Sequence, residues 1–251
     1  MPEPVLEARG LTRRFGALAA AEDISLALRP GECHAVIGPN GAGKSTLVAM
    51  LAGEQRPDSG TVLLGGEDVT RLGAAARARL GIARSFQITQ LCRGLSVREN
   101  VLLAAQGASG RSFGLLRPAG RDPARGGVAD AALTAAGLAA RAALPAALLS
   151  HGEQRQLELA IALAQAPRAL LLDEPAAGLG PAETEALAAR LGALKGRVAM
   201  LLVEHDMDTV FALADRITVL AEGRVIASAT PEAIRADRRV REAYLGDVVD
   251  G

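Results

Sequence analysis

The segment GPNGAGKST, residues 38–46, constrains this chain more than any other feature of its sequence. It fits the pattern G-x-x-x-x-G-K-[ST], in which glycines let successive backbone N–H groups wrap around a phosphate. A helix that begins beside Gly43 would add the positive end of its dipole. Lys44 would then contact the β- and γ-phosphates of a nucleotide, and the Ser45 hydroxyl would ligate Mg²⁺. The residues predicted to hold the nucleotide here are Gly38, Pro39, Asn40, Gly41, Ala42, Gly43, Lys44, Ser45 and Thr46.

Charged and aromatic residues argue against a nucleic-acid partner. The chain has 28 basic and 28 acidic residues, no Trp and one Tyr, so neither a global basic field nor a stacking surface favours DNA or RNA. Among the basic residues only Lys44 and Lys195 are lysines. A chain that otherwise uses arginine has therefore kept lysine where a compact point charge suits phosphate.

We expect a cytoplasmic protein that reaches a membrane only through a partner. The N-terminus lacks the basic and then apolar layout of a signal peptide, and no run of about 18 apolar residues occurs. Cys33 and Cys92 are far apart and lack metal-ligand spacing, so we expect two thiols in a reducing compartment, with Cys33 an ordinary strand residue.

Short β-type runs alternate with helical patterns, which predicts an α/β fold with a largely parallel sheet. The predicted strands are 5–8, 24–28, 33–37, 61–64, 169–172, 198–203 and 217–220, and the predicted helices begin at Gly43, Ser96, Gly152, Pro181 and Met207. A mostly helical section, residues 88–160, interrupts this alternation and contains a Gly-, Arg- and Pro-rich stretch, 107–127, that predicts a long flexible loop. We therefore expect one domain with two lobes, a nucleotide-binding lobe of residues 1–87 and 161–251 and a helical lobe of residues 88–160.

The run ALLLDEP, residues 169–175, predicts a buried strand that ends in two carboxylates. A parallel strand delivers its carboxyl end to the ligand edge of an open sheet, where the phosphate loop would also lie. Asp173 would hold Mg²⁺ there through water. Glu174 would orient and deprotonate the water that attacks the γ-phosphate.

Four further motifs resemble those of ABC ATPases in order and spacing. LSHGEQRQLELA at 149–160 is similar to the family's LSGGQ-type signature, and SFQ at 85–87 resembles its glutamine loop. VEHDM at 203–207 resembles the histidine switch, and AAGL at 176–179 resembles the D-loop. The resemblance covers the whole chain and implies a P-loop NTPase (RecA-like) core with antiparallel β elements near the N-terminus and an inserted helical subdomain.

The resemblance also implies site roles that spacing alone does not give. Gln87 would contact Mg²⁺ or the attacking water, and His205 would touch the γ-phosphate and steady the water held by Glu174. Ser150 and Gly152, with Glu153 beside them, would bind the γ-phosphate of ATP held by a second subunit. Phe15 stands where the family places an aromatic residue, usually Tyr, against the adenine.

Taken alone, several of these residues have simpler interpretations. His205 could be a satisfied histidine at a strand end, Gln87 a solvated polar group and Ser150 a helix N-cap. We interpret His34 and His151 as structural, because three scattered histidines do not form a metal site by spacing.

The resemblance implies partners as well. A single copy of each motif implies a dimer, homomeric or heteromeric, that sandwiches two ATP molecules between ATPase subunits and drives separate transmembrane permease subunits. The chain resembles the ATP-binding subunits of branched-chain amino acid importers in five stretches: RSFQ, the insertion, LDEPAAGL, VEHDM and the tail REAYLG at 241–246. Such importers also work with a periplasmic substrate-binding protein. Subunits for urea or amide import or for lipopolysaccharide export share parts of this pattern. A soluble non-transport ABC ATPase is a further alternative, and a regulator without turnover is disfavoured by Glu174 and His205.

The chain also departs from the family pattern at a few positions. Gly180 follows the D-loop where Asp or Asn is common, His151 and Glu153 replace the commoner signature residues, and Phe15 replaces Tyr.

Overall fold

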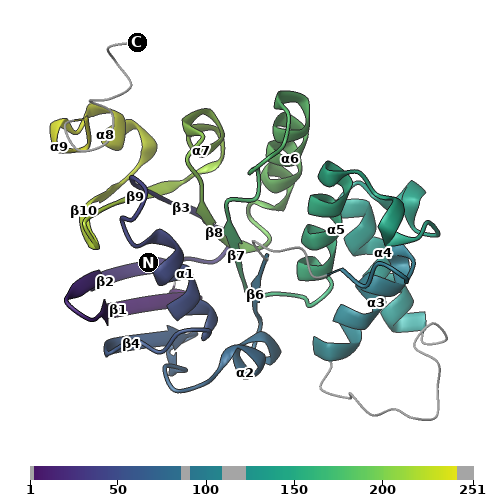
Figure 1. The fold of residues 1–251 in the computed structure, drawn as a ribbon, viewed down its shortest axis with the longest axis horizontal. Coiled ribbons are helices and arrows are strands. Elements are labelled where there is room, and N and C mark those ends of the chain that lie inside the picture. The colour runs from purple at the N-terminus through teal and green to yellow at the C-terminus, as the bar shows by residue number, and fades with distance from the viewer. Residues whose placement is uncertain (1–2, 86–90, 109–122, 242–251) are drawn as a thin grey trace.

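A computed structural model of the protein describes residues 3–85, 91–108 and 123–241. It contains two β-sheets and a set of helices (Figure 1). The strands are β1 (Leu6–Phe15), β2 (Leu18–Leu28), β3 (Cys33–Ile37), β4 (Ser59–Leu64), β5 (Glu67–Asp68), β6 (Ile82–Arg84), β7 (Ala169–Asp173), β8 (Ala199–Val203), β9 (Arg216–Ala221) and β10 (Arg224–Ala229). The α-helices are α1 (Lys44–Ala52), α2 (Ala74–Arg79), α3 (Val97–Ala108), α4 (Pro123–Ala135), α5 (His151–Leu163), α6 (Pro181–Leu194), α7 (Met207–Leu213), α8 (Pro231–Ala236) and α9 (Arg238–Val240).

The larger sheet has the strand order β10-β9-β3-β8-β7-β6, and all its pairings except that of β10 with β9 are parallel. Its central strands are buried along their whole length, which explains why CHAVI, ALLLD and AMLLV read as unbroken apolar runs. Because β8 lies between β3 and β7, the segments that follow these three strands meet at one edge of the sheet. The predicted α/β fold with a mostly parallel sheet is confirmed.

Alternate residues of the central strands face different layers. In β7, Ala169 and Leu171 pack with α1 and the smaller sheet, whereas Leu170 and Leu172 pack with α5 and α6. Figure 1 shows α1 and α5 on opposite sides of β7. The helix after the phosphate loop and the helix of the signature motif therefore cover opposite faces of one sheet.

The smaller sheet is antiparallel, with the order β2-β1-β4-β5. The predicted antiparallel elements near the N-terminus are confirmed, but β1 and β2 are longer than the apolar runs 5–8 and 24–28 that predicted them. Register shifts interrupt the pairing of β1 with β2, and their hairpin end is largely exposed, so the apolar alternation that marks a strand stops early.

The helices α3, α4 and α5 enclose a hydrophobic cluster of their own. The prediction of a loop over 107–127 is wrong at both ends, because α3 continues to Ala108 and α4 begins at Pro123. Proline suits a first helical turn, while Gly126 and Gly127 weaken the helical signal. Burial of Ala129 and Leu133 in the cluster offsets that weakness. The rest of the expected loop, residues 109–122, lies outside the described residues.

Other elements had no prediction from the sequence: β5, β6, β10, α2, α4, α8 and α9. Most are short, and their apolar positions are too few to define a period. Among the described residues, no helix combines the length and the apolar character needed to cross a membrane.

His34, in the middle of β3, gives a testable pH dependence. Its Nε2 lies 2.7 Å from Thr218 Oγ1 and its Nδ1 lies 3.2 Å from the carbonyl oxygen of Ala27, so it links three strands, in keeping with a structural role. Burial lowers the pKa of His34 from 6.5 to about 4. Between these values the unfolded chain binds a proton that the folded chain does not, so the free energy of unfolding should fall by up to about 1.4 kcal/mol per pH unit as the pH drops.

Urea unfolding of the wild type and His34→Gln at pH 7, 6 and 5 measures this contribution. We expect a shallower loss of stability with falling pH in the variant, whatever its stability at pH 7. His151→Gln, which changes an exposed imidazole, should keep the wild-type slope. Equal slopes in all three proteins would show that His34 does not contribute.

Candidate active site

Residues 38–46 form a tight turn between β3 and α1. Gly38, Gly41 and Gly43 have positive φ angles of 151°, 80° and 98°. A side chain at Gly38 would collide with the carbonyl oxygen of Leu220, and one at Gly43 with that of Ala20. Glycine is therefore required at both positions, by the backbone conformation and by the close approach of neighbouring strands.

Lys44 opens α1 and is only 7% exposed. Its Nζ donates hydrogen bonds to the carbonyl oxygens of Gly38 (2.6 Å) and Pro39 (3.0 Å). Burial lowers the pKa of Lys44, and the nearby carboxylates of Glu174 and Asp173 oppose that shift. The ammonium thus lies within electrostatic reach of the two acids at the carboxyl end of β7. Ser45 is exposed and Thr46 half-buried in the same helical turn.

Asp173, the last residue of β7, is 3% exposed and paired with arginine. Arg84, at the end of the neighbouring strand β6, donates from Nη2 to its Oδ2 at 2.7 Å and also pairs with Glu54. The other oxygen, Oδ1, is buried and has no hydrogen-bond partner among the described residues. The sequence predicted no role for Arg84, because the pairing of β6 with β7 is a tertiary contact and β6 is too short to recognise in the sequence.

Glu174 follows Asp173 with its backbone in the left-handed region, at φ 49°. This conformation costs a non-glycine residue about 1 kcal/mol or more. The N–H of Glu174 donates to the carbonyl oxygen of Val203 (2.9 Å), and the N–H of Ala177 donates back to the carbonyl oxygen of Glu174 (3.1 Å). Glu174 is therefore the first residue of a turn that leaves the sheet edge.

Glu204 and His205 follow β8 at the same edge. The side chain of His205 is 63% exposed, and its Nδ1 lies 3.7 Å from Glu204 Oε2. Glu204 is 1% exposed, and its Oε1 accepts a hydrogen bond from the N–H of Ala176 (2.9 Å). Burial raises the pKa of Glu204. Glu204 belongs to the VEHDM motif but had no predicted role, although an acid directly after a buried strand is the same signal that predicted Asp173 and Glu174.

The signature segment begins α5 with a complete capping box. Ser150 Oγ accepts from the N–H of Glu153 (3.2 Å), and Glu153 Oε2 accepts from the N–H of Ser150 (2.9 Å). Arg141 also donates to Glu153 Oε1 at 2.9 Å. The backbone hydrogen bond from Ser150, followed by the charge of Arg141, lowers the pKa of Glu153. Ser150 is thus a helix N-cap, and Gly152 lies against the carboxylate of Glu183 on α6.

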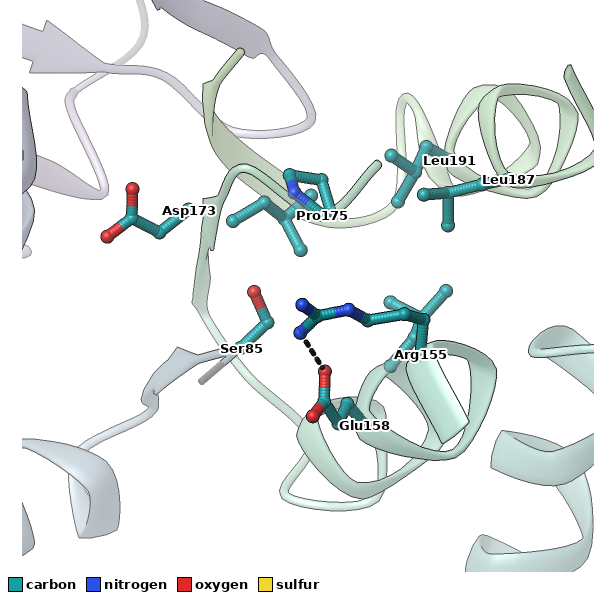
Figure 2. A pocket seen from close by; sticks show the side chains of 9 residues that line it. Ser85, Arg155, Glu158, Asp173, Pro175, Leu187 and Leu191 are labelled. Atoms are coloured by element: carbon teal, nitrogen blue, oxygen red, sulfur yellow. Dashed lines mark hydrogen bonds and ion pairs between the residues drawn. The ribbon is translucent and has the colours of Figure 1, made fainter. Parts of the chain in front are cut away.

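A small cavity lies between α5, α6 and the ends of β6 and β7 (Figure 2). Ser85, Asp173 and Pro175 line it on the strand side. On the helix side, Arg155 donates from Nη1 to Glu158 Oε2 at 3.0 Å, and Figure 2 shows this pair facing the strand ends. Charged groups therefore occupy the junction between the signature helix and the edge that carries Asp173. Gln87, two residues beyond Ser85, lies outside the described residues.

Phe15, the predicted adenine contact, ends β1 and is 47% exposed. The guanidinium carbon of Arg13 lies 5.1 Å from the centre of its ring, within cation–π range. The β1–β2 hairpin carries Phe15 and also the Ala20 carbonyl that abuts Gly43. An exposed aromatic ring therefore lies on the hairpin that supports the phosphate loop.

Apart from Phe15 and Gln87, the predicted site residues fall into two groups in space. The phosphate loop, Asp173, Glu174 and His205 share one edge of the six-stranded sheet. Ser150, Gly152 and Glu153 start a helix packed on the face of the sheet that α1 does not cover. Among the described residues, no cluster of three or more His, Cys, Asp or Glu side chains forms a metal cage.

This arrangement agrees with comparisons to known proteins. A family model described as "ABC transporter" matches residues 21–177. The chain belongs to the ABC transporter family. As a member of this family it is an ATP-binding subunit that hydrolyses ATP to support transport. A second model, described as "Branched-chain amino acid ATP-binding cassette transporter", matches residues 224–250.

Relatives similar over their full length are amino acid transport proteins by name. The "High-affinity branched-chain amino acid transport ATP-binding protein LivG" of Escherichia coli K12 is 40% identical, over 98% of this chain and 100% of its own. The corresponding BraF protein of Pseudomonas aeruginosa is also 40% identical, with the same coverage. A "Ribose import ATP-binding protein RbsA 3" of Rubrobacter xylanophilus is 37% identical, over 95% of this chain but 47% of its own.

Solved structures of ATP-binding cassettes have the same fold. The ADP conformation of MJ1267, an ATP-binding cassette of an ABC transporter, is 28% identical with a TM-score of 0.85, covering 97% of this chain and 99% of that one. A nucleotide-free cassette from an ABC transporter is 27% identical with a TM-score of 0.84, covering 96% and 98%. A dimeric post-hydrolysis state of the cassette MJ0796, bound to ADP and Pi, is 25% identical with a TM-score of 0.75, covering 90% and 98%.

Proposed function

We propose that this chain is the ATP-hydrolysing subunit of an importer for branched-chain amino acids. The observation that carries this proposal is the 40% identity to LivG over 98% of this chain and the whole of that one. The match of residues 224–250 to the branched-chain family model supports the same substrate class. The ribose relatives are less similar, and each is about twice as long as this chain.

We further propose that the working unit contains two such subunits facing each other. Lys44 and Ser150 begin helices on opposite faces of one sheet, so a single chain has no evident way to bring both to one triphosphate. A two-fold dimer removes this difficulty, because each subunit can offer its signature segment to the partner's phosphate loop. In that arrangement Ser150, Gly152 and Glu153 meet the γ-phosphate at the positive end of α5.

In the proposed site the phosphates of ATP lie in the turn of residues 38–46. Lys44 would exchange its contacts with the Gly38 and Pro39 carbonyls for the β- and γ-phosphates, and Phe15 would stack on the adenine. When bound, Mg²⁺ would supply positive charge against the negative charge that develops on the phosphate. Ser45 and Gln87 would hold the ion directly and Asp173 through water. The buried and unpartnered Oδ1 of Asp173 fits this role, as does the lack of an all-protein cage in the described residues.

Hydrolysis would use the acid that follows Asp173. Glu174 is the proposed general base for the attacking water, and His205 would donate a hydrogen bond to the γ-phosphate. A general base of this kind contributes about 10²- to 10⁴-fold to a rate. Gln87 would sense occupancy and pass it to a helical lobe formed by residues 88–160, whose proposed limit falls shortly before the end of α5.

Transport itself would take place in partner proteins. We propose that transmembrane permease subunits hold this chain at the inner face of the cell membrane and that a periplasmic binding protein delivers the substrate. ATP-driven closure of the dimer would move the helical lobes and thereby the permease.

Reconstitution tests this proposal. The chain is co-expressed with permease subunits of a branched-chain amino acid importer and placed in proteoliposomes with a binding protein for these amino acids. We expect leucine, isoleucine or valine to stimulate ATP hydrolysis, and ribose or urea to leave the rate unchanged. Stimulation by ribose or urea alone would overturn the substrate assignment.

A further inference from the structure

Glu204 contacts both backbone segments that carry the proposed hydrolytic residues. It follows β8, is 1% exposed, and lies next to His205 in the chain. Its Oε1 accepts a hydrogen bond from the N–H of Ala176, in the loop after Glu174. Its Oε2 accepts one from the N–H of His205 (3.2 Å). We infer that Glu204 is a positioning residue that fixes the Glu174 turn and His205 relative to each other, an inference that rests on their proposed roles.

The Glu174 turn needs such an anchor because its backbone is strained. Glu174 has a left-handed conformation that a non-glycine side chain adopts only where the surroundings enforce it. The turn is held on one side by the bond from the Glu174 N–H to the Val203 carbonyl, which continues the β7–β8 ladder. Glu204 holds it on the other side through Ala176. Both contacts come from consecutive residues of one strand end, so the turn is fixed to β8.

His205 needs an orienting contact for a different reason. His205 is largely exposed, so little packing orients its ring. Glu204 Oε2 accepts from its backbone N–H and lies 3.7 Å from its Nδ1. Glu204 therefore limits the positions that the backbone and the ring of His205 can take relative to the Glu174 turn.

Only a carboxylate can accept both hydrogen bonds, from the N–H of Ala176 and from the N–H of His205. The groups that it contacts are N–H donors, and an ionised carboxylate offers acceptor oxygens on both sides. In Glu204→Gln the amide keeps one acceptor oxygen, while its NH₂ group faces one of the two donors. The variant can therefore hold the Glu174 turn or His205, but not both. The buried position keeps water from substituting for the missing acceptor.

The test compares basal ATP turnover and ATP binding in the purified chain. We expect Glu204→Gln to lower kcat by about 10- to 100-fold, since a misplacement of about 1 Å can cost that much. The Kd for ATP should change less than threefold, because Glu204 does not contact the phosphate loop. Adding His205→Ala to Glu204→Gln should cost less than the product of the two single effects, because one residue acts through the other.

Glu32→Gln is the matched control. Glu32 precedes β3 at the opposite edge of the same sheet, and it likewise accepts a backbone N–H bond, from Arg29 at 2.8 Å. The Glu32→Gln substitution should leave kcat unchanged. Circular dichroism checks the fold of each variant. If Glu204→Gln does not fold, Glu204→Asp replaces it, because aspartate keeps the charge but shortens the side chain.

The possible outcomes test the positioning role of Glu204 separately from the assignment of the active site. A folded Glu204→Gln protein with wild-type kcat would overturn the positioning role, and a loss that is multiplicative with that of His205→Ala would overturn the action of Glu204 on His205. If Lys44→Ala also kept full turnover, the proposed active site itself would be wrong. The substrate of the importer does not enter either measurement.

Discussion

The Glu174→Gln variant should bind ATP as the wild type does, form a stable dimer and hydrolyse ATP about 10²- to 10⁴-fold more slowly. Glutamine has the size of glutamate but cannot take a proton from water at neutral pH. ATP would therefore persist at the proposed interface, where its γ-phosphate would contact Lys44 of one copy and Ser150 of the other. Light scattering after gel filtration with and without ATP and Mg²⁺ measures the dimer, and phosphate release measures turnover.

Glu222→Gln is a closely matched control for this variant. Glu222, in the β9–β10 turn, has the same left-handed φ of 49° and is exposed. The same chemical change at the same backbone conformation should alter neither turnover nor mass. A Glu174→Gln protein that stays monomeric with saturating ATP and Mg²⁺ would contradict the shared-site arrangement, and one with wild-type turnover would exclude Glu174 as the base.

Lys44→Ala should weaken ATP binding by about 10- to 100-fold, the effect of losing a charged hydrogen bond in a partly buried site. Turnover should fall by a further factor of about 10² to 10³, because the ammonium also faces the charge that develops in the transition state. Titration with a fluorescent ATP analogue separates the first effect from the second. Lys44→Arg should not restore activity, since a planar fork does not fit the narrow contact with the Gly38 and Pro39 carbonyls.

The second lysine of the chain provides the control. Lys195 pairs with Asp215 at 2.8 Å, next to the start of β3 and far along that strand from the phosphate loop. Lys195→Ala removes the same charge and should leave both ATP affinity and turnover as in the wild type. Equal losses from the two substitutions would mean that net charge, and not the position of Lys44, governs binding.

The sequence by itself determined the local chemistry of this protein. The spacing of Gly38, Gly43 and Lys44 predicted a glycine-dependent turn, and the structure requires glycine at both positions because side chains there would strike neighbouring carbonyls. The apolar runs predicted β3, β7 and β8, since a parallel strand buried on both faces must be apolar throughout. Asp173 and Glu174 could be placed at the edge of the phosphate loop because parallel strands end together, whereas the role of His205 came only from the resemblance to ABC ATPases.

The tertiary structure decided which distant residues lie close together and which the sheet separates. Helix α4 forms despite Gly126 and Gly127, because burial between α3 and α5 outweighs weak propensity. The pairing of Arg84 with Asp173 and the contact of Glu204 with Ala176 join residues 89 and 28 positions apart. The separation of Lys44 from Ser150 by a sheet follows from which face each helix covers. Local patterns specify a residue's own turn or strand, whereas such contacts depend on how distant strands are ordered, and only the packed sheet fixes that order.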